Sequence, residues 1–196
     1  MQKELTANRI GGRAIGAMFF TGFGSGWLFL SLVAMQKLAA GTATGVGLST
    51  LALLAACGYV ALQAKRWPRV PDDPAMGRAF VWINVIQWTA VAAVAFGFAR
   101  LHIDAYVISA ITAIVGLHMF PLARLFRYAW HYVTGAALVG WAAATVLLFS
   151  KDEMQGATAL GTGAILWLSA LLTLALAMRA MRAQPNASQQ RAAAEF

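Results

Sequence analysis

Charged side chains are scarce in this chain, and acidic ones most of all. Charged residues make up 11% of the 196 positions, and only seven of them are Asp or Glu, whereas soluble domains carry about 25% charged residues. Hydrophobic residues reach 60%, against about 45–50% in soluble domains. This composition argues against a packed soluble domain and makes the lipid bilayer the expected partner.

Several kinds of reactive residue are also missing. Cys57 is the only cysteine, so the chain forms no internal disulfide and has no thiol pair for redox or soft-metal chemistry. It has no glycine-rich phosphate loop and no zinc-binding His/Glu motif. Every Asp and Glu lies outside the long apolar stretches except Asp104, which stands at the edge of one. The sequence therefore predicts no catalytic residues, no metal ligands and no cofactor.

The sequence holds parts of two known kinds of site, a serine protease site and a haem site with two histidine ligands, but neither set of residues is complete. The segment 22–26 (GFGSG) has the look of the serine motif of rhomboid proteases, yet the last apolar stretch holds no histidine to activate a serine. Haem ligation by two histidines needs both at one depth on facing helices. Only His118 and His131 fall on the same side of the membrane, and His131 is expected at its surface.

Long apolar runs dominate what is present. A helix needs about 20 apolar residues to cross a hydrocarbon layer of about 30 Å, and membrane strands would instead alternate apolar and polar residues in segments of about 10. We predict an all-α, polytopic bundle, a single domain over residues 1–183 followed by a polar, disordered tail at 184–196. Its six transmembrane helices are expected at 14–35, 43–64, 79–99, 103–122, 129–150 and 157–177. The longest connection, 65–78, holds three prolines and is expected to be extended.

The basic residues predict which way the bundle faces. Alternate ends of the six predicted helices face the same side of the membrane. Twelve of the 15 Lys and Arg residues adjoin the ends that face one side, and only Lys37, Arg100 and Lys151 adjoin the ends that face the other. The positive-inside rule then places both termini in the cytoplasm, which agrees with an even number of crossings. Because the basic residues gather on no single segment, nucleic-acid binding is not expected. The first run is too long for the core of a cleaved signal peptide, typically 7–15 residues.

Glycines on the first helix predict close helix contacts. Gly12 and Gly16, and likewise Gly22 and Gly26, have the spacing that lets two helix backbones approach each other. The spacing fits packing within one subunit and packing between copies in a homo-oligomer. It does not choose between them.

Polar residues at membrane depth are the best site candidates. Asn84 and Gln87 are three residues apart and share a helix face, and His118 on the next helix lies at a similar depth below the cytoplasmic surface. Intramembrane polar groups turn toward the bundle interior, where they pair or mark a solute path. Histidine changes charge near neutral pH. Pro121, one turn later, lacks the N–H that would bond the carbonyl of Leu117, giving a kink or a helix end beside His118.

A basic and aromatic belt follows at the inner surface. Arg124, Arg127 and His131 stand among tyrosine and tryptophan residues. Such belts anchor helices at headgroup level. The alternative is a specific pocket for an anionic headgroup or solute.

The segment 116–126 (GLHMFPLARLF), followed by 132–135 (YVTG), resembles a stretch found in small, uncharacterised multi-pass membrane proteins of bacteria. It covers about a tenth of the chain. The resemblance implies a bacterial inner-membrane protein and no known activity.

Two functions fit the whole sequence. The first is a small-solute transporter, facilitator or channel that uses the layer of Asn84, Gln87 and His118. The second is a scaffold, assembly factor or regulatory protein in which these residues only hold helices together. A hydrated layer would favour the first, and a dry, mutually hydrogen-bonded one the second.

Overall fold

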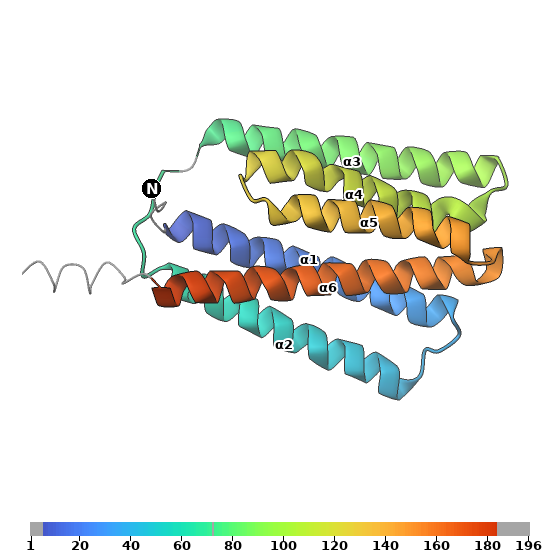
Figure 1. Ribbon diagram of the computed structural model, residues 1–196, viewed down its shortest axis with the longest axis horizontal. Coiled ribbons are helices and arrows are strands. Elements are labelled where there is room, and N and C mark those ends of the chain that lie inside the picture. The colour runs from blue at the N-terminus through green and yellow to red at the C-terminus, as the bar shows by residue number, and fades with distance from the viewer. Residues whose placement is uncertain (1–5, 72, 184–196) are drawn as a thin grey trace, which may run out of the picture.

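The structure is a computed structural model that describes residues 6–71 and 73–183. Within these ranges every regular element is helical, and six helices are long and apolar enough to cross a membrane (Figure 1). They are α1 (Ala7–Ala34), α2 (Ala40–Ala64), α3 (Pro74–Arg100), α4 (Val107–Leu125), α5 (Trp130–Leu148) and α6 (Lys151–Ala183), and one short 3-10 helix, η1 (Asp104–Tyr106), precedes α4. The predicted all-α, multi-pass fold is confirmed. The tail at 184–196 lies outside the described residues.

Four helices, α1, α2, α3 and α6, begin earlier than their apolar windows, and polar side chains cap the first turns of α1 and α3. The Thr6 side-chain oxygen accepts a hydrogen bond from the backbone N–H of Arg9 at 3.4 Å, and α1 begins at the next residue, Ala7. The Asp73 carboxylate accepts the backbone N–H two residues on, at 2.8 Å, and α3 starts at Pro74. A proline in the first helical position favours the helix because its fixed φ suits it. The extended connection expected over 65–78 therefore ends at Asp73.

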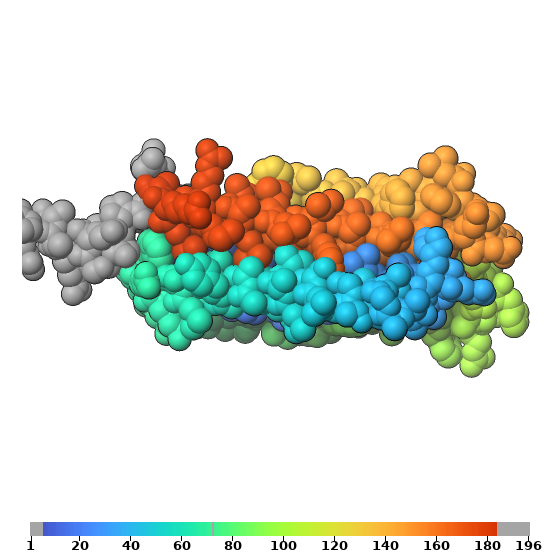
Figure 2. Space-filling model, turned by 90° about the horizontal axis from the view of Figure 1, so that it is seen from below, coloured from blue at the N-terminus to red at the C-terminus, as the bar shows by residue number. Residues whose placement is uncertain are grey.

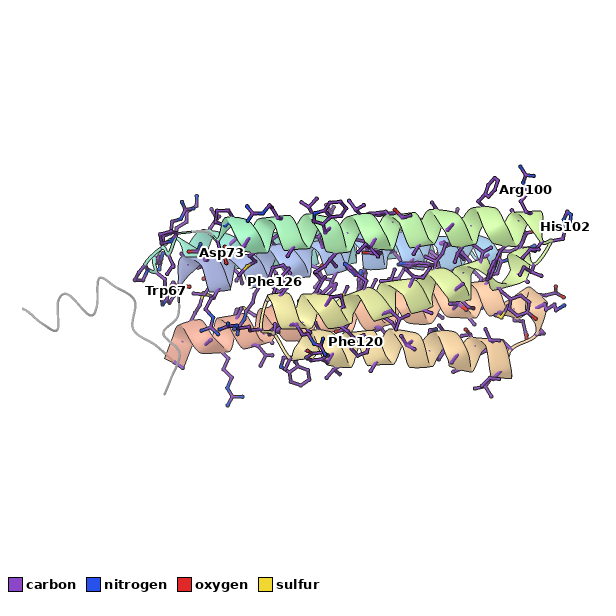
Figure 3. All side chains as sticks on the ribbon, turned by 90° about the horizontal axis from the view of Figure 1, so that it is seen from above. Trp67, Asp73, Arg100, His102, Phe120 and Phe126 are labelled. Atoms are coloured by element: carbon purple, nitrogen blue, oxygen red, sulfur yellow. The ribbon has the colours of Figure 1, made fainter. Side chains whose placement is uncertain are left out.

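The described chain begins and ends at the same end of the bundle (Figure 1). Trp67, Asp73 and Phe126 lie toward that end, while Arg100 and His102 lie at the other (Figure 3). We call the first the basic end, because it carries most of the cationic residues. Successive helices run in opposite directions between the two ends.

A central pair of antiparallel helices, α1 and α6, makes the most extensive contact in the bundle (Figure 1). Their backbones meet at Gly24 and Gly163. A Cβ added to Gly163 would lie 2.8 Å from the carbonyl oxygen of Gly24, and one added to Gly24 would lie 3.1 Å from the carbonyl oxygen of Gly163. Only glycine permits so close an approach.

The four glycines singled out by their spacing are not the ones used here. No described atom lies within 4 Å of a Cβ added to Gly12, Gly16, Gly22 or Gly26. Gly24, between the last two, makes the contact instead. The predicted contact between copies through this open face stays a prediction.

The other helices surround the central pair unequally. Helix α2 lies on α1 and beside α6 (Figure 2), and only Cys57, Val60 and Ala64 of α2 are buried. Helices α4 and α5 form a second close pair, which contacts α6. Helix α3 packs mainly on α4, and within Pro74–Arg100 no residue is buried. Helix α3 is therefore the most peripheral and least constrained span.

Candidate functional site

The α4–α5 hairpin brings two histidines to one region of the interior. The helices cross at Gly116 and Gly135, where a Cβ on Gly135 would lie 2.6 Å from the Gly116 carbonyl oxygen and the reverse distance would be 2.8 Å. His118 follows Gly116 by two residues, and His131 precedes Gly135 by four. Because the helices are antiparallel, both histidines lie on the basic-end side of this crossing.

His118 is the least satisfied polar side chain of this region. Both of its ring nitrogens are shielded from solvent, and neither makes a hydrogen bond of good geometry to a described residue, although the ring lies near the backbone of Val115, one turn back on α4. Pro121 lies inside α4, which continues to Leu125, so it does not end the helix. Its missing N–H leaves the carbonyl oxygen of Leu117 without its usual helical donor. One turn of α4 thus offers an imidazole and a backbone acceptor to a hydrogen-bonding ligand.

Asn84 and Gln87 lie on the half-buried face of α3. The rings of Phe80 and Phe126 meet with centroids 5.9 Å apart and set the register of α3 against α4. Gln87 follows Phe80 by seven residues on α3, and Met119, the neighbour of His118, precedes Phe126 by seven residues on α4. Gln87 and His118 therefore lie at a similar depth on adjacent helices, and Asn84 lies about one turn nearer the basic end.

These three residues are nevertheless not joined to one another. Asn84 donates its amide N–H to the carbonyl oxygen of Phe80 on its own helix, at 2.8 Å. Among residues 6–71 and 73–183, no hydrogen bond links Asn84, Gln87 and His118. Asn84 is satisfied by its own helix, whereas the ring nitrogens of His118 are not satisfied by either residue of α3.

His131 turns inward rather than toward the surface. Its ring is surrounded edge-on by Phe20 of α1 at 5.6 Å, Phe126 at 6.3 Å and Tyr128 at 5.0 Å between centroids. Its Nδ1 is shielded and has no partner among the described residues. The Arg13 guanidinium lies 5.2 Å above the Tyr128 ring. The Nδ1 side of His131 is thus enclosed by aromatic rings, although the residue as a whole is only half-buried.

Arg124 and Arg127 take different positions in the belt. Arg124 lies in the last turn of α4 with its side chain exposed. Arg127 occupies the α4–α5 turn with φ of 49°, a left-handed conformation that glycine usually fills at a helix end. The predicted headgroup role of Arg124, Arg127 and His131 stays a prediction, with the two arginines at the surface and His131 inside.

A row of hydroxyl pairs joins α6 to α4 and α5, and the sequence predictions missed it. Thr158, Thr162, Ser169 and Thr173 are spaced by four, seven and four residues, which places them on one face of α6. This spacing was the available signal, but Ser and Thr are common in membrane helices. The pairs are Ser109–Thr158 (3.0 Å), Ser109–Thr145 (3.4 Å), Thr145–Thr158 (2.9 Å), Thr112–Thr162 (2.9 Å), Thr134–Ser169 (2.9 Å) and Tyr128–Thr173 (3.3 Å).

A smaller hydroxyl cluster ties α1 to its other neighbours. Ser25 is 2.7 Å from the Thr50 hydroxyl of α2, and the Trp167 indole of α6 donates to Ser25 at 3.2 Å. The side chains of Ser25, Thr50 and Trp167 are hydrogen-bonded to one another, whereas Asn84, Gln87 and His118 are not. Among the described residues, the shielded side-chain nitrogens without a partner are both of His118, Nδ1 of His131 and Nε1 of Trp67, which lies in the α2–α3 connection at the basic end (Figure 3).

Metal chemistry finds little support in this geometry. In the described ranges, no group of three or more His, Cys, Asp or Glu side chains is placed to hold a metal ion. Comparisons of the chain with protein-family models, with curated proteins and with solved structures found no match. The assignment of function therefore rests on the geometry of the site.

Proposed function

We propose that the protein is a transporter or facilitator for a small, neutral or weakly charged solute, which it binds in the layer of Asn84, Gln87 and His118. The observation that carries the proposal is the pair of shielded, unpartnered nitrogens of His118. An unsatisfied buried polar group costs about 1–3 kcal/mol. A neutral imidazole has one donor and one acceptor, so a solute with both functions satisfies the ring. The solute thereby offsets a cost that the empty site carries.

Helix α3 is the element best placed to open this layer. It contacts mainly α4, and the Trp88 ring lies 6.4 Å from the ring of Phe23 on α1. The α1–α6 and α4–α5 pairs are instead held by glycine crossings and hydroxyl pairs. Movement of α3 away from α4 exposes His118 without disturbing either pair. The described conformation is then the closed one, because the ring nitrogens are shielded.

We place the protein in a bacterial inner membrane, with the basic end and both termini in the cytoplasm. In the sequence, 12 of the 15 cationic residues adjoin the same set of ends of the apolar stretches, which supports this orientation by the positive-inside rule. The six apolar helices support the multi-pass arrangement. The resemblance of segment 116–126 to bacterial membrane proteins supports the compartment.

A membrane scaffold or assembly partner is the second candidate function. It is favoured by the hydroxyl pairs between α4, α5 and α6, which are dry and mutually satisfied, such as Thr112 with Thr162 at 2.9 Å. Interhelical hydrogen bonds of this kind contribute about 0.6 kcal/mol each on average. They account for the rigidity of that half of the bundle, and leave the nitrogens of His118 unexplained.

A second copy of the chain is proposed to pack on the open glycine face of α1. Gly12, Gly16, Gly22 and Gly26 leave the backbone accessible there, and the exposed side chains of Phe19 and Phe23 flank them. Small residues permit the backbone contact that stabilises helix pairs in lipid. A pair of copies would also place α3 near the interface, because α3 meets α1 through Phe23.

The transport proposal predicts that His118→Ala abolishes most of the solute flux. In proteoliposomes, glycerol and urea uptake is followed by stopped-flow light scattering and proton flux by an internal pH dye. We expect wild-type protein to raise the permeability of at least one of these solutes. His118→Ala should lower that permeability at least about tenfold, because losing a hydrogen bond worth about 1.5 kcal/mol changes binding by that factor.

The matched control is His102→Asn, at the opposite end of the bundle. His102 is exposed and has φ of 56°, a conformation that asparagine tolerates. We expect wild-type flux from this variant. Wild-type permeability equal to that of empty liposomes for every solute, or equal flux with and without His118, would favour the scaffold function.

A further inference from the structure

A groove runs along the outside of the bundle between α3 and α4, apart from the shielded nitrogens of His118. It has a volume of about 510 Å³ and is open to the side rather than enclosed. Arg124 is the only charged residue among those that line it, and the others are apolar. The lining residues are Ile83, Phe120, Pro121, Arg124 and Leu125.

Among the described residues, Arg124 has no partner for its charge. Within residues 6–71 and 73–183, no carboxylate or ring contact is recorded for its guanidinium. It is exposed in the last turn of α4, at the basic end. An unpaired guanidinium beside an apolar groove needs an anion that carries an apolar part, because the charge and the groove must be satisfied together.

We propose that this groove binds an anionic phospholipid. The phosphate is held by Arg124, and an acyl chain lies along Ile83, Phe120 and Pro121. Guanidinium matches a phosphate oxygen pair in shape and charge. The groove opens on a lateral face of the bundle, which is the face that lipid covers in a membrane. Arg124 lies at the end of a spanning helix, which is headgroup depth.

Two features restrict the occupant to a lipid of net negative charge. A zwitterionic headgroup brings a cation of its own toward Arg124 and toward the other basic residues of this end, such as Arg127. A free anion leaves the apolar walls exposed. The site uses neither nitrogen of His118, but it lies along the α3–α4 contact that the proposed transport movement opens, so lipid retention and solute flux are measured separately and the two proposals can fail separately.

The test uses the full-length protein, equilibrated with an equimolar mixture of dioleoyl phosphatidylglycerol and dioleoyl phosphatidylcholine. Retained lipids are counted by native mass spectrometry. We expect wild-type protein to retain phosphatidylglycerol preferentially. Arg124→Gln should lower that preference about fivefold, since one basic residue near a membrane surface contributes about 1 kcal/mol toward an anionic lipid. Arg124→Lys should keep a large part of it because the charge remains.

The matched control is Arg179→Gln, an exposed cation near the basic end of α6 and outside the groove. It should leave the lipid preference unchanged. An equal loss in Arg179→Gln and Arg124→Gln would show general attraction by the basic end and would overturn the groove site. Equal retention of the two lipids by wild-type protein would overturn it as well. Helical content by circular dichroism confirms that each variant is folded.

Discussion

Replacement of Gly135 by alanine is expected to destabilise the bundle by about 1–3 kcal/mol, the usual cost of overpacking. The added methyl would lie 2.6 Å from the carbonyl oxygen of Gly116 and 3.0 Å from the Cβ of Met119. A backbone carbonyl does not move aside as a side-chain tip does, so α4 and α5 must separate. The change is measured as a shift in the unfolding midpoint of purified protein in detergent.

Gly140→Ala on the same helix is the control for this prediction. A Cβ at Gly140 meets no described atom within 4 Å, and the residue is exposed. Alanine has a better helix propensity than glycine by about 1 kcal/mol, so Gly140→Ala should be neutral or slightly stabilising. Equal destabilisation by the two variants would mean that α4 and α5 do not cross at Gly135.

A larger effect is expected from Gly163→Leu, at the centre of the α1–α6 pair. Even its first carbon would lie 2.7 Å from Cγ of Leu28 and 2.8 Å from the carbonyl oxygen of Gly24. The remaining carbons have no space, and α1–α6 is the most extensive contact in the bundle. We expect the variant to lose about 3 kcal/mol or more and to be recovered largely as misfolded protein in size-exclusion chromatography.

Gly22→Leu tests the face of α1 that does not contact α6. No described atom lies within 4 Å of a Cβ at Gly22, so a single copy should fold normally. If two copies pack through this face, as proposed, the variant should be a folded monomer where the wild type is a dimer.

A folded Gly163→Leu protein would show that α1 and α6 do not meet as the structure describes.

The general fold was predictable because composition and length decide it. Six apolar runs leave no alternative to spanning helices when lipid cannot satisfy an exposed backbone. The helix starts at Thr6 and Asp73 were less predictable, since they depend on side-chain caps rather than on hydrophobicity. Pro74 favoured helix rather than loop because of its position, directly after a capping aspartate.

The rotation of each helix was not predictable from the sequence. Gly22 and Gly26 have the familiar spacing, yet Gly24 faces α6, because facing depends on which neighbour each helix meets. His131 stands next to interfacial residues in the sequence, and its ring is turned inward among Phe20, Phe126 and Tyr128. Depth along each helix was accessible, since it needs only residue counts, and it predicted a similar depth for His118 and Gln87.

The most direct test of the account is whether water reaches the layer of Asn84, Gln87 and His118. Gln87→Cys is treated in sealed vesicles with a charged methanethiosulfonate reagent applied at the basic end. Such reagents react with thiolates, which form only where water enters. Wild-type Cys57, which is fully buried, and Thr112→Cys, at a dry hydroxyl pair, serve as unreactive controls. The account predicts that Gln87→Cys is modified at least about tenfold faster than either control. Modification no faster than at Thr112→Cys would contradict it, since the layer would then be dry and the scaffold function would remain.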